Sequence, residues 1–306
     1  MGDAKEIEII DVGPRDGFQN VRTFIDTEQK LQIIDGLVRA GIRSMEVTSF
    51  VHPKAIPQMA DAAQVAQTVR NRYPDLRAIA LVPNLRGAEN AAKAGIREIS
   101  CVISASEAHN KANVNRTVAE SLEGLQQICE AFPKLRVRLD IATAFGCPFS
   151  GNTEAEQVLK LAETAVRTGV KEIVLCDTIG VANPVQVAEL ARAALERLPG
   201  IPFTMHFHNT RGLGLANICS AIQAGVTSFE TSVGGLGGCP FAPGSEGNTA
   251  TEDTVHMLRA MGMDTGVDLD RLLEAVQYVA EHVDAEVTGK MLRVTSSSCS
   301  TVSGKA

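Results

Sequence analysis

The amino-acid sequence predicts an α/β fold, a (β/α)8 TIM barrel with one additional helix near the C-terminus. Strand-like apolar stretches alternate with amphipathic helical stretches, as parallel strands joined by crossover helices require. Two kinds of helix-to-strand junction also alternate along the chain, one with a glycine and one with a proline. Eight such units fit within roughly 250 residues, the usual size of this barrel.

The junctions show where the helices stop. Four helical stretches end in a glycine that is followed by an apolar β-branched residue. Glycine takes the left-handed conformation that ends a helix, and the next residue packs back on the last turn. At the other three junctions a proline stops the helix. The glycines are Gly41, Gly95, Gly169 and Gly225, and the prolines are Pro74, Pro133 and Pro199.

These junctions, with an opening strand, predict eight strands in order. They lie near 6–12, 44–50, 77–82, 98–104, 135–145, 172–178, 202–209 and 228–235. A further helix is expected at 268–284 and a serine-rich tail at 296–303. We therefore expect a TIM-barrel catalytic domain at 1–262, with a C-terminal helix and tail at 263–306 packed on or trailing from it. A doubly wound sheet is the rival, disfavoured because no glycine-rich phosphate-binding loop follows the first strand.

Composition limits the possible functions. The chain has 306 residues, of which 44% are apolar, enough for one large core. A net charge of −7 argues against nucleic acid or an anionic membrane as partner. No apolar stretch approaches the roughly 18 residues that cross a bilayer, and no targeting pattern is visible. The seven cysteines form no C-x-x-C pair, so neither disulfides nor structural zinc is expected. A cytoplasmic enzyme fits these features.

Polar residues gather where the predicted strands end, which is the active-site face of a TIM barrel. His206 and His208 are two apart on one strand, so both imidazoles point to the same face and can reach one ion. Asp16 follows the first strand, and Asn248 follows the eighth. A carboxylate and an amide oxygen shift the preference of this set toward Mg²⁺ or Mn²⁺. The alternative is that the histidines only hydrogen-bond inside the barrel.

Other residues at this face suggest acid–base and oxyanion chemistry. Arg15 adjoins Asp16, so its guanidinium can clamp an enolate oxygen beside the ion, or form an ordinary salt bridge. Glu46 and Asp177 can orient Arg15, accept a substrate proton or close the polar network. Cys239 lies in a glycine-dense loop that can fold over the barrel mouth and deliver a thiol. Its alternative is a loop cysteine without function.

These motifs resemble the 3-hydroxy-3-methylglutaryl-CoA lyase family, within the metal-dependent TIM-barrel lyases and synthases that include isopropylmalate synthase. The resemblance covers about residues 6 to 275. Its most specific part is the glycine–cysteine loop at 234–240, with Gly247 and Asn248 beyond it, which separates the lyases from the synthases. The other segments that carry it are 11–20, 48–51, 53–54, 57–59, 83–85, 146–148 and 177–180.

The resemblance implies one divalent cation per subunit, Mg²⁺ or Mn²⁺, and a role for each candidate residue. Arg15 would stabilise an enolate, and Cys239 would be a mobile acid and base. The implied sets are Asp16, His206, His208 and Asn248 for the metal, Arg15, Cys239, Glu46, Asp177 and His206 for catalysis, and Arg15, Gln19, Ser49 and Asn113 for substrate binding.

The implied reaction is retro-Claisen cleavage of 3-hydroxy-3-methylglutaryl-CoA to acetyl-CoA and acetoacetate, as in leucine degradation and ketone-body formation. The implied partners are an acyl-CoA and further copies of the chain as a homodimer or higher oligomer, without nucleic acid or membrane. Two departures leave the acyl group open: Asn209 and Arg211 replace Asp and Tyr after the histidine pair, and His109 stands where Phe is common. The alternatives are a lyase for a related acyl-CoA, a condensing citramalate or isopropylmalate synthase-like enzyme, and a barrel scaffold without activity.

Overall fold

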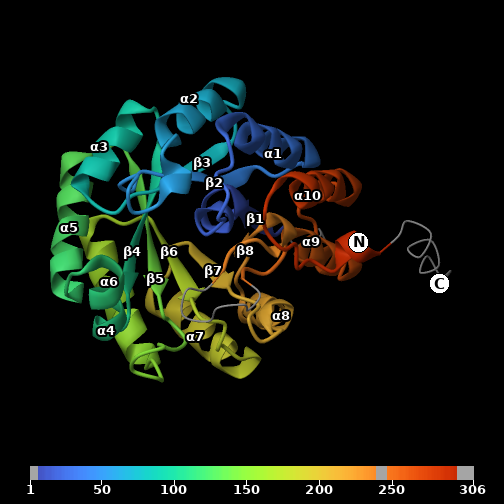
Figure 1. The fold of residues 1–306 in the computed structure, drawn as a ribbon. Helices are drawn as coiled ribbons and strands as arrows, with labels where there is room; N and C mark the ends of the chain where they lie inside the picture. The colour runs from blue at the N-terminus through green and yellow to red at the C-terminus, as the bar shows by residue number, and fades with distance from the viewer. Residues whose placement is uncertain (1–5, 239–246, 295–306) are drawn as a thin grey trace.

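The eight predicted strands form one closed parallel barrel in sequence order, with β8 hydrogen-bonded to β1. Figure 1 shows the helices as a ring around this barrel. The computed structural model describes residues 6–238 and 247–294. The strands are β1 (Glu8–Asp11), β2 (Ser44–Ser49), β3 (Arg77–Leu81), β4 (Glu98–Ser104), β5 (Arg136–Ala142), β6 (Glu172–Asp177), β7 (Phe203–Phe207) and β8 (Ser228–Thr231).

At least one helix follows every strand, and the connection from β4 to β5 holds two. Among the residues that the structure describes, no helix combines the length and the apolar character needed to cross a bilayer. The helices are α1 (Thr27–Ala40), α2 (Ala62–Arg72), α3 (Leu85–Lys93), α4 (Glu107–Val114), α5 (Val118–Ala131), α6 (Ala155–Thr168), α7 (Pro184–Arg197), α8 (Gly214–Ala224), α9 (Thr251–Ala260) and α10 (Leu269–His282).

The glycines predicted to end helices all do so, because all four have φ between 86° and 112°. Such angles are strained for any residue that carries a Cβ. Gly41 is also tightly packed: a Cβ there would lie 2.4 Å from the backbone oxygen of Gly266, in the segment before α10. This junction therefore serves both the end of α1 and the docking of the C-terminal part of the chain.

Two strands end three or more residues earlier than predicted. The strand expected at 228–235 stops at Thr231, because Gly234 and Gly235 have φ of 67° and 66° and leave the extended conformation. The strand expected at 135–145 stops at Ala142, because Thr143 has φ 57°. In both cases a left-handed residue turns the chain away from the sheet at the C-terminal face.

The predicted C-terminal helix is α10, which packs on α1 and α9 (Figure 1). The backbone amide of Asp268 donates to the carbonyl of Ala40 at 2.7 Å, and Thr288 donates to the carbonyl of Gly234 at 2.9 Å. The described part of the C-terminal segment therefore lies against the barrel. A domain boundary at 262 and 263 remains a prediction, and the tail at 296–303 lies outside the described residues.

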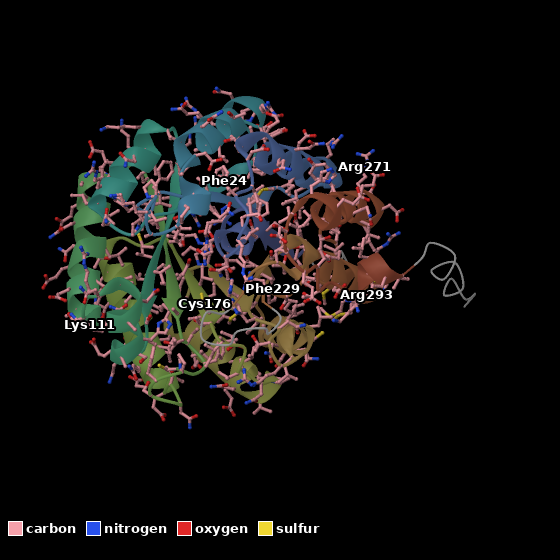
Figure 2. The ribbon with its side chains drawn as sticks, in the orientation of Figure 1. Phe24, Lys111, Cys176, Phe229, Arg271 and Arg293 are labelled. Carbon is pink, nitrogen blue, oxygen red and sulfur yellow. The ribbon has the colours of Figure 1, made fainter. Side chains whose placement is uncertain are left out.

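The apolar core lies mainly between the barrel and its helices. Figure 2 shows Phe229 in the middle of the molecule and Lys111 and Arg271 at its periphery. Phe229 is completely buried. The N-terminal end of the barrel is instead filled by charged side chains. We call this set the basal cluster, which consists of Glu8, Arg77, Glu98, Arg136 and Glu172.

Candidate active site and metal centre

A cavity of about 900 Å³ opens where the strands end at the C-terminal face of the barrel. In TIM barrels the loops at this face carry the catalytic groups. Side chains predicted from the sequence for metal binding, catalysis and substrate binding meet in this cavity. Those that line it are Arg15, Asp16, Gln19, Asn113, His206 and His208.

The loop after β1 presents Arg15 and Asp16 on a single π-helical turn, Gly13–Gly17. Gly13 packs so closely on Val233 that a Cβ would lie 2.6 Å from the valine Cγ1. π-helical turns are frequent at functional sites. Here the turn aims two adjacent charged side chains, Arg15 and Asp16, at the cavity.

Asp16, His206 and His208 converge as the sequence predicts. One ligand atom from each lies within 4.8 Å of the others, and the two imidazole centroids are 5.1 Å apart. Burial raises the pKa of Asp16, but the attraction of Arg15 and the two histidines and the hydrogen bond from Asn248 together outweigh it and lower that pKa to about 2. Burial lowers the pKa of His206 to about 3 and also lowers the pKa of His208. An ionised carboxylate and two neutral imidazoles are the protonation states that metal binding requires.

Asn248 completes the donor set. A backbone bridge pairs it with His208, and its amide nitrogen donates to Asp16 Oδ2 at 2.7 Å and to the carbonyl of Leu236 at 3.0 Å. Its buried Oδ1 has no hydrogen-bond partner within the described residues. A buried oxygen without a partner is costly, and a cation would satisfy it. The carboxylate, two imidazole nitrogens and amide oxygen therefore fit a divalent cation.

Arg15 is held rigidly beside this set. Its guanidinium bonds to Asp16 Oδ1 at 2.5 Å and forms a second ion pair with Glu46 Oε2. Burial lowers the pKa of Arg15, but the carboxylates of Glu46 and Asp16 raise it above its usual value, so Arg15 stays charged. Burial raises the pKa of Glu46 to about 7 despite the attraction of Arg15. Among the roles considered for Glu46, orienting Arg15 is the one this contact supports.

Two predicted site residues that the structure describes, Asp177 and Ser49, do not line the cavity. The carboxylate of Asp177 accepts hydrogen bonds from the amides of Val181 at 2.9 Å and Ala182 at 3.1 Å, so it holds the loop after β6. Burial raises the pKa of Asp177 to about 6. Ser49 is completely buried, and the described lining of the cavity includes neither Ser49 nor Asp177. Cys239 lies outside the described residues.

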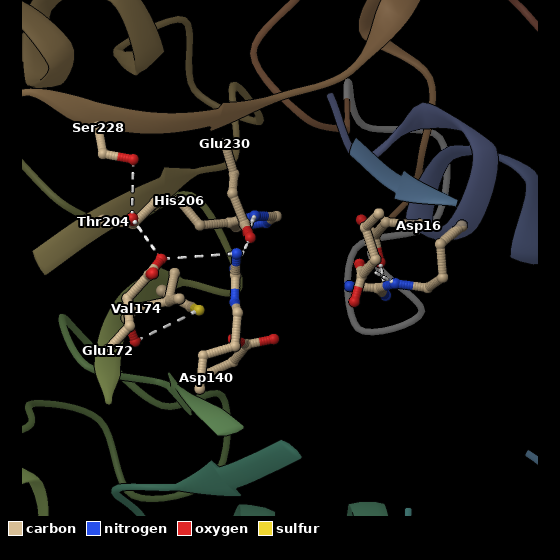
Figure 3. Close-up of polar contacts among 12 residues, drawn as sticks. Asp16, Asp140, Glu172, Val174, Thr204, His206, Ser228 and Glu230 are labelled. Carbon is tan, nitrogen blue, oxygen red and sulfur yellow. Dashed lines mark hydrogen bonds and ion pairs between the residues drawn. The ribbon is translucent and has the colours of Figure 1, made fainter. Parts of the chain in front are cut away.

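The sequence reasoning missed two charged residues: Glu230, which lies directly behind His206, and Arg138, which contacts Glu230. Glu230 Oε2 lies 2.8 Å from His206 Nδ1, and Glu230 Oε1 pairs with Arg138 (Figure 3). Arg138 also reaches Asp140 at 3.4 Å. The available signal was a charged residue in the middle of a strand that is otherwise buried.

The two sequence departures after the histidine pair do not line the cavity as described. Asn209 Oδ1 accepts from the amide of Gly214 at 3.0 Å, at the start of α8. The Arg211 guanidinium donates to the carbonyls of Ile179 and Gly180, at 2.8 and 3.0 Å. His109 does line the cavity, and its Nδ1 lies 2.6 Å from a serine hydroxyl. Of the three, His109 is the one placed to contact a substrate.

A closed barrel whose C-terminal face brings a carboxylate and two imidazoles together over a large cavity defines a TIM-barrel enzyme with a candidate metal centre. The model of the HMGL-like family matches residues 6–279. The chain belongs to this family, and it is a carbon–carbon lyase.

The relatives agree with this assignment. The chain is 46% identical to the hydroxymethylglutaryl-CoA lyase of Bacillus subtilis, over 96% of this chain and 99% of that protein. It is 42% identical to the (R)-citramalyl-CoA lyase of Chloroflexus aurantiacus, over 90% of each. The crystal structure of the Bacillus subtilis lyase matches with a TM-score of 0.91 over 96% of this chain and 99% of that chain, at 45% identity. An HMG-CoA lyase from Acinetobacter baumannii, in complex with coenzyme A and 3-methylmalate, matches with a TM-score of 0.91 at 38% identity over 96% of each chain.

Proposed function

We propose that the chain cleaves 3-hydroxy-3-methylglutaryl-CoA to acetyl-CoA and acetoacetate. The observation that carries the proposal is the convergence of Asp16, His206 and His208 in a cavity large enough for an acyl-CoA head. The two named relatives at 46% and 42% identity are both acyl-CoA lyases, which favours cleavage over condensation or a scaffold role.

Asp16, His206, His208 and Asn248 would hold the divalent cation, Mg²⁺ or Mn²⁺. When bound, such a cation supplies a Lewis acid that makes a coordinated hydroxyl easier to deprotonate and neutralises developing negative charge. The protein fixes the geometry: Asn248 donates to Asp16 at 2.7 Å, and both are buried. Donors that are already in place need little reorganisation when the ligand arrives.

Arg15 is the residue we propose for enolate stabilisation. Its guanidinium is buried, permanently charged and held by Glu46 and Asp16 while lining the cavity. A cation fixed in a site that excludes water stabilises a developing oxyanion far more than it would in water. Gln19, which donates to Asp16 at 3.2 Å, and Asn113 would contact the substrate.

The proposed cleavage requires two proton movements. A base takes the proton of the tertiary hydroxyl, the hydroxyl oxygen forms a carbonyl, and the bond to the thioester α-carbon breaks. The electron pair of that bond forms the enolate of acetyl-CoA, which then takes a proton at its α-carbon. Cys239 is our proposal for the group that exchanges these protons. Gly238, the residue before it, lines the cavity.

A second candidate substrate is a citramalyl-CoA-like thioester. The position of His109 in the cavity and the 42% identity to a citramalyl-CoA lyase favour it. Like the first substrate, it carries a tertiary hydroxyl next to the bond to be broken, so the same residues could cleave it. The homodimeric or higher assembly, the cytoplasmic location and the domain boundary also remain proposals.

The test is cleavage by the purified protein of both thioesters, followed by acetyl-CoA release, with Mg²⁺, with Mn²⁺ and with EDTA. Turnover of the hydroxymethylglutaryl thioester that EDTA removes and either metal restores supports the proposal. Metal-dependent cleavage of the citramalyl thioester alone transfers the assignment to the second candidate. Lack of cleavage of either thioester by metal-loaded protein contradicts both.

A further inference from the structure

The two candidate metal-binding histidines have different surroundings. His206 Nδ1 lies 2.8 Å from Glu230 Oε2, and both side chains are buried. His208 Nδ1 is buried without a hydrogen-bond partner in the part of the chain that the structure describes. One imidazole therefore has a carboxylate behind it, and the other has none.

A carboxylate at this distance fixes the proton of a neutral imidazole. An ionised carboxylate only accepts hydrogen bonds, so its partner nitrogen must carry the proton. With the proton on Nδ1, the lone pair of His206 lies on Nε2, and His206 lines the cavity where Asp16 also lies. A carboxylate behind a metal-binding histidine also fixes the orientation of the ring and raises its basicity.

Glu230 is itself held in place by an ion pair. Its other oxygen forms an ion pair with Arg138, which is completely buried. Arg138 also pairs with Asp140 at 3.4 Å and with Glu172 at 3.7 Å (Figure 3). The guanidinium of Arg138 stays protonated, so its contact with Glu230 is a charge-assisted hydrogen bond, which is stronger than one between neutral groups.

We propose that Glu230, held by Arg138, is a positioning residue that keeps His206 in the Nδ1–H tautomer with Nε2 directed at the cation. The inference deepens the proposed metal site and rests on it. Its first consequence is visible in the metal-free protein, whereas the metal site itself requires a binding measurement. The two can therefore fail separately.

The first experiment is ¹⁵N NMR of histidine-labelled protein without metal at neutral pH, with His206 assigned by its absence in a His206→Gln variant. We expect the Nδ1–H tautomer in the wild-type protein. In Glu230→Gln the side-chain amide can donate as well as accept, so we expect a shift toward the Nε2–H tautomer. An Nε2–H tautomer in the wild-type protein would overturn the proposal without any variant having to fold.

The matched control is Glu172→Gln. Glu172 is another buried carboxylate near Arg138, at 3.7 Å, and no hydrogen bond or ion pair described by the structure joins it to His206. Glu172→Gln and Glu230→Gln both remove a carboxylate next to Arg138. If the tautomer shift came only from disturbing Arg138, both variants should show it. We expect the His206 tautomer to be unchanged in Glu172→Gln. An equal tautomer shift in both variants would contradict a specific role for Glu230.

The second experiment is titration with Mn²⁺, followed by the loss of the free-ion EPR signal. Removing a group that orients a metal ligand typically weakens metal binding by about 10–100-fold. We expect a loss of that size in Glu230→Gln and little change in Glu172→Gln. Equal affinity in Glu230→Gln and wild type would overturn the proposal. A wild-type protein that shows the expected tautomer but does not bind Mn²⁺ would overturn the metal site, and with it the proposed role.

Discussion

Both ends of the barrel interior contain buried polar side chains, but they differ in whether these side chains have partners within the protein. In the basal cluster, Arg77 reaches Glu8 at 2.8 Å and Glu98 at 2.5 Å, and Glu172 accepts from both Arg77 and Arg136. At the C-terminal end, Asn248 Oδ1 and His208 Nδ1 are buried without partners in the described chain. The charges in the basal cluster are paired with each other, whereas these two atoms at the C-terminal end have no protein partner in the described chain.

The difference separates structural polar groups from functional ones. A buried ion pair lowers the cost of its own burial through its partner, whereas a buried atom without a partner leaves that cost uncompensated until a water or a ligand binds it. Arg138 lies between the two regions, since it contacts Glu172 on one side and Glu230 on the other. Arg138 thus links the paired charges of the basal cluster to the candidate metal site at the C-terminal end.

The largest expected effect is on activity, and it comes from a substitution in the candidate metal site. His208→Ala removes one ligand atom from the candidate metal set. We expect kcat/KM to fall on the order of 10³-fold or more, together with loss of Mn²⁺ binding and an unchanged circular dichroism spectrum.

The control for this variant is His256→Ala, at an exposed position on α9. It removes an imidazole without touching the cavity, so activity and Mn²⁺ binding should stay at the wild-type level. Substantial turnover by His208→Ala in saturating metal would contradict the ligand assignment.

A substitution in the basal cluster should instead reduce the free energy of unfolding. Glu172→Ala leaves Arg138 and Arg77 without one of their carboxylates, and Glu172 is buried. Removing one partner of a buried ion pair costs about 3–5 kcal/mol. Urea unfolding should show this loss. If the free energy of unfolding were unchanged while activity disappeared, the distinction between the two ends would be wrong.

The buried acid Glu252 should give a smaller effect on stability, and this effect should depend on pH. Glu252 accepts from the amide of Gly234 at 3.0 Å, and burial raises its pKa from 4.5 to about 8. The unfolded chain therefore releases this proton before the folded protein does. Its stabilising contribution is complete below pH 4.5 and is lost as the pH rises to about 8.

Glu252→Gln tests this directly, because glutamine stays neutral throughout. The free energy of unfolding should fall from pH 5 to pH 8 in both proteins. We expect this fall to be roughly 1–3 kcal/mol smaller in the variant than in the wild type. Asp11, whose pKa burial raises to about 7, still titrates in the variant, so part of the pH dependence should remain. Parallel stability curves for the two proteins would show that Glu252 is already ionised in the fold.

The smallest effect concerns substrate choice. His109 lines the cavity and is held by Ser104, but it is not among the candidate metal ligands. We expect His109→Phe to change the ratio of kcat/KM for the hydroxymethylglutaryl and citramalyl thioesters by about tenfold, with Mn²⁺ affinity unchanged. An unchanged ratio would place His109 outside the acyl-binding part of the cavity.

Local sequence rules predicted most of the barrel. The helix-ending glycines depend on backbone conformation within a few residues, so Gly41, Gly95, Gly169 and Gly225 were identified correctly. The convergence of His206, His208 and Asp16 followed from strand alternation and from the known active-site face. These inferences need no knowledge of contacts between distant side chains.

The residues that were missed depend on such contacts. Glu230 meets Arg138 across 92 positions and His206 across 24. The direction of the Asp177 side chain was also not predictable, because a carboxylate at a strand end can point into the cavity or back to its own loop, where it accepts from Val181 and Ala182. Spacing alone does not choose between these directions, since the packing of neighbouring strands sets them.

The hydrogen bond from Thr288 to the carbonyl of Gly234 has a practical consequence for protein engineering. Gly234 begins the glycine-rich segment that leads to the cavity, so the base of that segment is fastened by residues 54 positions further along the chain. Truncating the protein before 287 would therefore release the entrance of the cavity, although no cavity residue is removed. An affinity tag or reporter fused beyond 294 leaves this hydrogen bond and the described part of the C-terminal segment unchanged.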